Sequence, residues 1–265
     1  MVFSTASCTR LFFYPQKELV RTPASLGFDY DDVYMTTRDG VRIHGWIIKP
    51  LKKPLGSVFF LHGNAENIST HIGSIEWLVE AGYQALIIDY RGYGLSDGVA
   101  NVPDVFEDIR AGADWLLSSD PARPVVVFGQ SLGASLTITA LQRFPEITQQ
   151  FDALISEAAF SRYRSIGREV AASHWLTWPF QYPVAWLLRR PYDPLDSIAE
   201  LQIPLLLVHS VNDEIIGIHH ARELYAQANN PKQLLETTGP HIQAVANPSN
   251  RIRILDFIEQ LTIDD

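Results

Sequence analysis

The stretch that decides the fold is Val125-Val126-Val127-Phe128-Gly129-Gln130-Ser131-Leu132-Gly133. The apolar run at its start is typical of a strand buried on both faces, and residues Ala134 to Phe144 continue with helical spacing up to Pro145. The segment between them fits G-x-S-x-G, a sharp turn that exposes a serine at the tip of a strand. We expect the two glycines to be required because side chains there would collide with the adjacent strand and helix. Ser131 then lies at the amino end of a helix, where the helix dipole favours negative charge.

The five-residue pattern is only moderately specific when taken alone. Gly and Ser are common residues, so it arises by chance in roughly one chain of this length in ten. Its placement between a buried strand and a helix is the context that the turn requires. The sequence therefore predicts that Ser131 is a nucleophile on this sharp turn, which is called a nucleophile elbow.

Further apolar runs bounded by Gly, Pro or Asp predict the other strands. They are Ser57 to Leu61, Ala85 to Ile88, Ala153 to Ile155, Leu205 to Val208 and Gln233 to Leu235. Segments with helical spacing alternate with these runs, namely Glu66 to Glu80, Val105 to Leu117 after a cap at Asp104, Ile218 to Ala228 and Pro248 to Leu261. The alternation predicts an α/β fold in which a mostly parallel sheet carries helices on both faces. Val33 to Thr37 and Val41 to Ile48 flank Asp39-Gly40, which predicts a hairpin that adds an antiparallel edge.

Two segments depart from this alternation. Residues 1–30 are irregular, and we expect an N-terminal extension that packs on the core through Phe12-Phe13-Tyr14, leaving 31–265 as the α/β domain. Residues 160–200 contain no clean strand and predict a small helical cap insertion over a site. The alternative is a peripheral helical pair that buries its aromatic residues on the core. These aromatic residues are Tyr163, Trp175, Trp178, Phe180, Tyr182 and Trp186.

A serine hydroxyl is a poor nucleophile without a base. For elbows of this kind the partners follow in the order serine, acid, histidine. Asp213, just past the tip of one predicted strand, and His241, just past the next, fit that order. We expect His241 to take the Ser131 proton and return it to the leaving group, and Asp213 to hold the imidazole in the required tautomer. Glu157, which closes the preceding strand, is the alternative acid.

The negative charge that develops on a substrate carbonyl needs two backbone N–H donors. We expect one from Leu132, the residue after the nucleophile. The second is expected in the loop His62-Gly63-Asn64-Ala65, with Asn64 as the first choice and Ala65 as the second. His219 and His220 come too early in the chain for the histidine loop, and a surface or capping role is expected for them.

Composition excludes several other classes. The chain has 265 residues, a net charge of −9 and no basic stripe, so no nucleic-acid partner is expected. A single cysteine, Cys8, allows no internal disulfide. The sequence lacks the cysteine and histidine spacing that is typical of a zinc site, so no metal is expected. The glycines at positions 92, 94 and 98 follow a strand, but their spacing does not fit a dinucleotide-binding loop.

Location depends on how the N-terminus is interpreted. No apolar run is long enough to span a bilayer, and the chain as written predicts a cytoplasmic protein. Thr5-Ala6-Ser7-Cys8 loosely resembles the site before a lipidated bacterial cysteine. A true start further upstream would instead favour a lipoprotein anchored to the membrane through Cys8.

These residues together resemble the α/β-hydrolase superfamily. The His62-Gly63-Asn64-Ala65 loop, the segment Asp89-Tyr90-Arg91-Gly92-Tyr93-Gly94-Leu95-Ser96 and the Gly129-to-Gly133 elbow are similar to those of a serine esterase or serine aminopeptidase-like branch. The resemblance covers residues 30–262 and implies an eight-stranded sheet, an acyl-serine intermediate and no cofactor. One departure is Glu66, where similar loops often carry glycine.

The function expected from these features is hydrolysis of carboxylic esters with short to medium acyl chains, with a small-molecule ester as the partner. An amide, peptide or thioester hydrolase with the same catalytic triad is the enzymatic alternative. An inactive hydrolase scaffold used for binding is the alternative that is not an enzyme. The sequence makes no prediction about oligomeric state.

Overall fold

The computed structural model describes residues 10–173 and 192–262. Its centre is an eight-stranded sheet with the order β10-β9-β8-β7-β4-β6-β3-β2. Within this sheet β3 pairs antiparallel with β2 and β6, and the remaining pairs are parallel, so β3 alone runs against the others. The mostly parallel, eight-stranded sheet is thereby confirmed. Its strands are β2 (Asp29–Thr36), β3 (Arg42–Lys49), β4 (Gly56–Leu61), β6 (Tyr83–Ile88), β7 (Val125–Gln130), β8 (Ala153–Glu157), β9 (Leu205–Ser210) and β10 (Lys232–Thr237).

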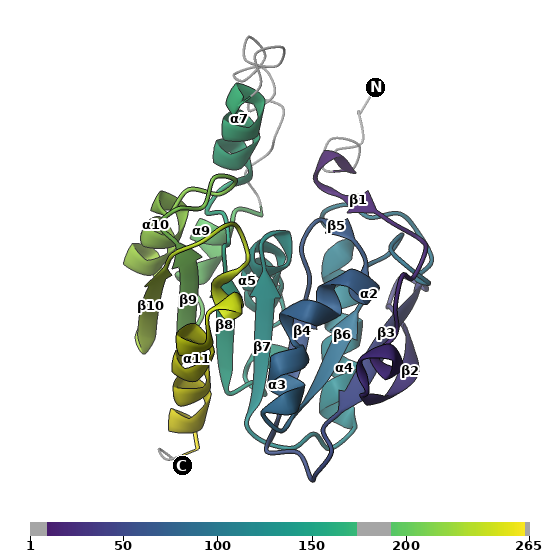
Figure 1. Cartoon of the computed structure of the whole chain (residues 1–265). Coiled ribbons are helices and arrows are strands. Elements are labelled where there is room, and N and C mark those ends of the chain that lie inside the picture. The colour runs from purple at the N-terminus through teal and green to yellow at the C-terminus, as the bar shows by residue number, and fades with distance from the viewer. Residues whose placement is uncertain (1–9, 174–191, 263–265) are drawn as a thin grey trace, which may run out of the picture.

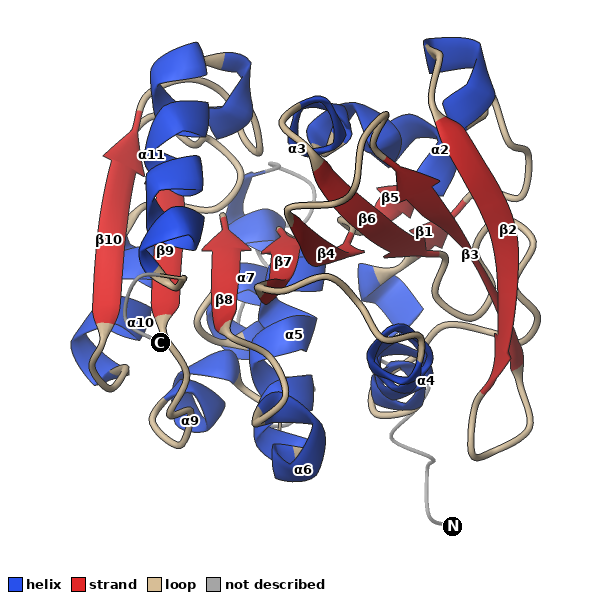
Figure 2. Cartoon of the chain, turned by 90° about the horizontal axis from the view of Figure 1, so that it is seen from below, coloured by secondary structure: helices blue, strands red, loops and turns tan. Residues whose placement is uncertain are grey.

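Helices cover both faces of the sheet, as Figure 2 shows from below. One face carries α4 (Val105–Ser118), α5 (Leu132–Arg143), α6 (Pro145–Thr148), α9 (Pro194–Ile198) and α10 (His219–Gln227), and the other carries α3 (Glu76–Glu80) and α11 (Pro248–Gln260). The central strands β4 and β7 are buried along their whole length. Because successive side chains of a strand point to opposite faces, Phe59 packs in one apolar layer and Phe60 in the other.

The segment from Glu66 to Glu80 is not the single helix that its spacing predicts. It contains the second residue of β5 (Ala65–Glu66), then α2 (Ile68–His71), a 3-10 turn at Ile72–Ser74 and α3. The side chain of Asn67 caps α2 by accepting from the Ser69 amide, and it also donates to the carbonyls of Gln16 and Glu18. These long-range bonds set the start of the helix and were invisible in the local pattern. Asp104 stands at the N-cap position of α4 as predicted, but its side chain makes no capping bond and accepts from Asn101 instead.

The N-terminal segment lies along the main domain. A 3-10 turn at Arg10–Phe12 leads into β1 (Tyr14–Pro15), which pairs in parallel with β5. Phe13 is buried and Phe12 contacts Phe160 and Tyr163, whereas the Tyr14 side chain is 62% exposed. β2 begins at Asp29, so the sheet includes the last residues of the expected extension.

Within 160–200 the structure describes α7 (Tyr163–Ser173) and α9, which packs against α5. Figure 1 shows α7 and the N-terminal segment at the same end of the sheet. Of the aromatic residues expected in a cap, Trp175, Trp178, Phe180, Tyr182 and Trp186 lie outside the described residues, and so does Cys8. None of the helices in the described ranges combines the length and apolar character needed to cross a bilayer.

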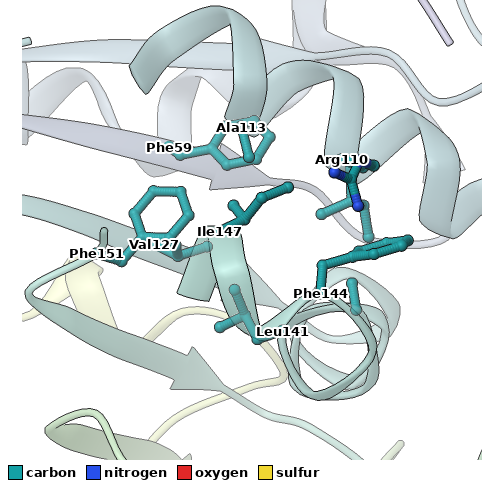
Figure 3. Close-up of a pocket in the computed structure, with 10 residues that line it drawn as sticks. Phe59, Arg110, Ala113, Val127, Leu141, Phe144, Ile147 and Phe151 are labelled. Carbon is teal, nitrogen blue, oxygen red and sulfur yellow. The ribbon is translucent and has the colours of Figure 1, made fainter. Parts of the chain in front are cut away.

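A small apolar cavity of about 10 Å³ lies where α4 and α5 meet the sheet (Figure 3). Phe59, Val127, Ile147 and Phe151 contribute to its lining. Phe151 precedes β8, so the cavity lies toward the amino ends of the strands. It has room for about one water centre, and the one polar side chain in its lining, Arg110, is paired with Glu146, so the cavity offers no site for a substrate.

Candidate active site

Ser131 occupies the junction between β7 and α5. Its backbone has φ 53° and ψ −120°, a conformation that residues other than glycine rarely adopt. The Ser131 amide donates to the carbonyl of Glu157 at the end of β8, at 2.8 Å, which anchors the turn to the neighbouring strand. A strained residue that the surrounding structure holds in place is typical of a functional site.

The two glycines of the elbow are required by packing, as the sequence predicted. A Cβ atom on Gly129 would lie 2.6 Å from the Cα of Ala134 in α5. On Gly133 it would lie 2.2 Å from the carbonyl oxygen of Leu61 in β4. Backbone atoms cannot move away as a flexible side chain can, so any larger residue at either position would displace the helix or the strand.

The structure brings Ser131, Asp213 and His241 together at the carboxyl ends of the strands. Nε2 of His241 lies 2.9 Å from Oγ of Ser131, and Nδ1 lies 2.7 Å from Oδ2 of Asp213. Asp213 follows β9 and His241 follows β10, so both loops end on the edge that also carries the elbow. A carboxylate only accepts hydrogen bonds, so Nδ1 carries the imidazole proton and Nε2 presents a lone pair to the serine hydroxyl.

The Asp213 carboxylate is buried and held by several donors. Oδ1 accepts from the amides of Ile215 and Ile216, each at 2.9 Å, while Oδ2 accepts from His241. Burial opposes ionisation, but the bonds from His241 and the two amides outweigh it and lower the pKa of Asp213. The carboxylate therefore remains charged at neutral pH and keeps the imidazole tautomer fixed.

His209 supports this turn, a role that the sequence analysis did not predict. Its Nε2 donates to the carbonyl of Ile216 at 2.7 Å, and the same nitrogen lies 3.6 Å from Oδ2 of Asp213. Burial lowers the pKa of His209, which favours the neutral ring. Its position four residues before Asp213, at the end of β9, was the one signal available.

Glu157, the alternative acid, takes different partners. It accepts from the side-chain amide of Gln130 at 2.6 Å and from the backbone amide of Ala244 at 3.0 Å. Burial raises the pKa of Glu157. The structure therefore places Glu157 between the elbow and the histidine loop, while the imidazole itself is bonded to Asp213.

The loop His62-Gly63-Asn64-Ala65 lies beside the elbow. A Cβ atom on Gly63 would be 3.7 Å from the Cβ of Ser131. Leu132 is the first residue of α5, so its amide is among those that a helix leaves without an internal partner. Glu66 has φ 64°, which explains why similar loops carry glycine there, and its side chain is exposed.

An open depression of about 710 Å³ lies beside His241. Ile215, Pro240 and Ile242 give it apolar walls, and Glu214 adds a carboxylate. Because it adjoins the imidazole, a group bound there would lie next to the base. The structure thus offers space for part of a substrate on the histidine side of the site.

Glu169, His219 and His220 form a cluster in which one atom from each lies within 4.8 Å of the others. Nε2 of His220 lies 3.1 Å from Glu169, while its Nδ1 accepts from the Ser161 amide at 3.1 Å. An amide can only donate, so Nε2 carries the proton and has no lone pair for a metal. The donor set therefore does not fit a cation in this arrangement.

Comparisons with known proteins agree with this architecture. Residues 52–193 match the family model Hydrolase_4, described as serine aminopeptidase, S33. The chain is 28% identical to the uncharacterized protein YfhR of Escherichia coli K12, over 97% of this chain and 92% of that protein. It is 30% identical to the uncharacterized protein Rv2307c of Mycobacterium tuberculosis, over 90% and 82% of the two chains.

Among solved structures, the Pyrococcus furiosus esterase Pf2001 superposes with a TM-score of 0.77, covering 94% of this chain and 98% of that one. At 23% identity this likeness shows a shared fold. The family match spans more than half of the chain and includes both the Gly129-to-Gly133 turn and the His62-Gly63-Asn64-Ala65 loop. The protein is therefore a hydrolase of the α/β-hydrolase superfamily and belongs to the serine aminopeptidase S33 family.

Proposed function

We propose that the protein is a serine carboxylesterase that cleaves esters of short to medium acyl chains through an acyl-serine intermediate. The observation that carries the proposal is the continuous hydrogen-bonded chain from Ser131 through His241 to Asp213, at 2.9 and 2.7 Å. It is supported by the strained, partly accessible position of the serine. A binding module would have no use for a nucleophile, base and orienting acid in this arrangement.

The first half of the reaction follows from the proton positions. Oγ of Ser131 attacks the ester carbonyl carbon while its proton passes to Nε2 of His241. The carbonyl oxygen becomes an oxyanion, which the amide of Leu132 and the amide of Asn64 or Ala65 stabilise. When the tetrahedral intermediate collapses, the bond to the alcohol oxygen breaks and that oxygen takes the proton from Nε2. The alcohol leaves, and the acyl group remains on Ser131.

The second half repeats these steps with water. His241 removes a proton from a water molecule, whose oxygen attacks the acyl carbon. Collapse then breaks the bond to Oγ, which recovers its proton from Nε2. Asp213 stays ionised throughout and stabilises the imidazolium that forms twice in each cycle.

The apolar walls beside His241 support an ester with an uncharged alcohol or acyl portion. Ile215 is 58% exposed there, so this surface is available to a ligand. A surface that combines apolar side chains with a few polar groups is typical of sites that bind small molecules.

Aminopeptidase activity is the second candidate, because one observation favours it. Recognition of a free α-amine requires a carboxylate near the reacting centre, and Glu214 lies in the depression beside His241. The same nucleophile and base would serve an amide, provided that His241 protonates the leaving nitrogen.

The deciding experiment compares p-nitrophenyl esters from acetate to dodecanoate with amino-acid p-nitroanilides, using wild type and Ser131→Ala. We expect ester hydrolysis that peaks at a short or medium chain and is lost in the variant. Faster turnover of p-nitroanilides that falls in Glu214→Gln would favour the aminopeptidase. A wild-type protein inert toward both substrate series and toward a fluorophosphonate label would overturn the proposal in favour of a binding scaffold.

A further inference from the structure

The loop His62-Gly63-Asn64-Ala65, the proposed oxyanion loop, is bonded to the N-terminal segment. β1 pairs with β5, so the Tyr14 amide donates to the Asn64 carbonyl at 2.9 Å and the Gln16 amide donates to the Glu66 carbonyl at 3.1 Å. This short parallel ladder lies outside the eight-stranded sheet. It attaches a segment from the start of the chain to the loop that faces Ser131.

Tyr93 reinforces the same contact from a third part of the chain. Its hydroxyl donates to the Asn64 carbonyl at 2.6 Å and accepts from the Tyr14 amide at 3.2 Å. The Tyr93 side chain is fully buried, and its ring packs against Phe13 and His62. Burial raises the pKa of Tyr93, so the hydroxyl stays protonated and remains a donor over the physiological range.

Bonds to two carbonyls of this loop fix the direction of its candidate oxyanion donors, the Asn64 and Ala65 amides. In a trans peptide the C=O and N–H groups point in opposite directions. The Asn64 carbonyl is directed toward Tyr14 and Tyr93, which turns the Ala65 N–H away from them. The Gly63 carbonyl accepts from Nδ1 of His62 at 2.8 Å, which in the same way fixes the Asn64 N–H. Both candidate oxyanion donors are therefore oriented through the carbonyl of their own peptide.

We infer that the Tyr93 hydroxyl and the Tyr14 backbone amide are positioning groups for the oxyanion hole, in which they orient the Ala65 N–H. They act through the Asn64–Ala65 peptide and touch no reacting atom, so the N-terminal segment is part of the active-site scaffold. The inference rests on the proposed serine hydrolase function. A preorganised donor stabilises the transition state more than the bound substrate, so loss of positioning lowers kcat rather than raising KM.

The N-terminal segment has other anchors that would keep it docked when either group is removed. The Gln16 carbonyl accepts from the Gly94 amide at 2.9 Å and from the Asn67 side chain at 3.1 Å. Lys17 donates to the Ser96 carbonyl at 2.8 Å. A variant that removes one bond to Asn64 can thus be tested in a folded protein.

The first test is Tyr93→Phe, which removes the hydroxyl and keeps the ring. We expect kcat to fall by about tenfold with KM within about twofold, and the rate of Ser131 labelling by a fluorophosphonate to fall in parallel. Ser57→Ala is the control, because that buried hydroxyl donates to the Ala122 carbonyl at 2.6 Å at the opposite end of β4 and contacts no residue of the oxyanion loop. The control should lose a similar amount of thermal stability and keep kcat within about twofold.

The second test concerns the backbone amide alone. Tyr14→Pro deletes the N–H donor, whereas Tyr14→Ala removes only the exposed ring and retains the N–H. We expect kcat and the labelling rate to fall about fivefold in Tyr14→Pro and to stay near wild type in Tyr14→Ala.

Two results would overturn the inference while the proposed function stands. One is wild-type kcat in both Tyr93→Phe and Tyr14→Pro, and the other is an equal fall in kcat in each variant and its control. A wild-type protein that neither labels at Ser131 nor hydrolyses esters would instead overturn the proposed function, and the inference with it.

Discussion

Two serine–histidine–carboxylate arrangements occur among the residues that the structure describes, and they differ in ways that separate a reactive site from a structural one. In one, His241 links Ser131 to Asp213. In the other, Nδ1 of His220 lies 2.8 Å from Oγ of Ser161, and its Nε2 lies 3.1 Å from Glu169. Interatomic distances alone would rank the two alike.

The surroundings of the two serines are what distinguish them. Ser131 is 8% exposed and has a strained backbone at the start of α5, whereas Ser161 is fully buried. The lone pair on Nδ1 of His220 already accepts from the Ser161 amide, and the Ser161 hydroxyl also lies 2.7 Å from Glu223. The second arrangement therefore joins α7 to α10 and offers neither a free base nor access for a substrate. The comparison teaches that a reactive serine is recognised less by interatomic distances than by two other features. The serine is accessible, and the histidine nitrogen facing it has a lone pair that no backbone amide already uses.

The largest expected difference is between the effects on kcat of removing the Ser131 hydroxyl and of removing the Ser161 hydroxyl. Ser131→Ala should lower kcat for ester hydrolysis by at least about 10³-fold, because the nucleophile is lost. Ser161→Ala should keep kcat within about threefold. Steady-state assays on a p-nitrophenyl ester measure both. A loss of activity in Ser161→Ala that matches that in Ser131→Ala would break the comparison.

The two carboxylates should differ next. Asp213→Asn should lower kcat by about 10² to 10⁴-fold, because an amide donor opposite Nδ1 favours the wrong imidazole tautomer. Glu169→Gln should change kcat by less than about threefold. If Asp213→Asn retained nearly full activity, Glu157 would become the candidate acid, and Glu157→Gln would then show the larger loss.

Stability should respond in the opposite sense from activity. Ser131→Gly relieves a backbone conformation that costs on the order of 1 kcal/mol, so the free energy of unfolding should rise by about that amount. Ser161→Ala removes a buried hydroxyl that contacts His220 and Glu223, and it should lower the free energy of unfolding by about 1–2 kcal/mol. Urea unfolding of both variants against wild type checks the signs. A destabilised Ser131→Gly would show that the elbow is not strained.

The smallest effect concerns the pH dependence of stability. Burial lowers the pKa of His220, although Glu169 opposes this shift. The unfolded chain binds a proton at this residue below about pH 6.5 while the folded chain does not, so the stability from neutral His220 is lost as the pH falls below that value. His220→Gln should therefore make the free energy of unfolding less dependent on pH between about 7.5 and 5.5, by at most about 1.4 kcal/mol per pH unit.

Other buried histidines keep part of this dependence in both proteins, since burial lowers the pKa of His62, His71 and His209 as well. Chemical denaturation at the two pH values isolates the share of His220 as a difference. If the free energy of unfolding depended on pH equally in both proteins, His220 would make no contribution to this dependence.

Much of the fold could be predicted because its signals are local. The strand runs of β4 and β7 are apolar throughout since both faces are covered, and the elbow needs Gly129 and Gly133 because backbone atoms surround them. The order of Ser131, Asp213 and His241 along the chain followed from the order of the strand ends that carry them.

The features that could not be predicted depend on backbone carbonyls and on long-range partners. Nothing in the sequence around Tyr93 shows that its hydroxyl reaches the Asn64 carbonyl, or that Tyr14 meets it there. The break between β5 and α2 depends on Asn67 bonding to residues about fifty positions earlier. The choice between Asp213 and Glu157 likewise required the direction of the imidazole, which no spacing encodes.

The position of His241 after the edge strand β10 has a consequence for biosynthesis. Ser131 emerges from the ribosome with β7, but the imidazole that contacts it follows 110 positions later, after β9 and β10. A partly synthesised chain can form the elbow and its helix while the serine still lacks a base. Until His241, which follows the last strand of the sheet, has been translated and docked, the nascent chain lacks the base that the proposed catalysis at Ser131 requires.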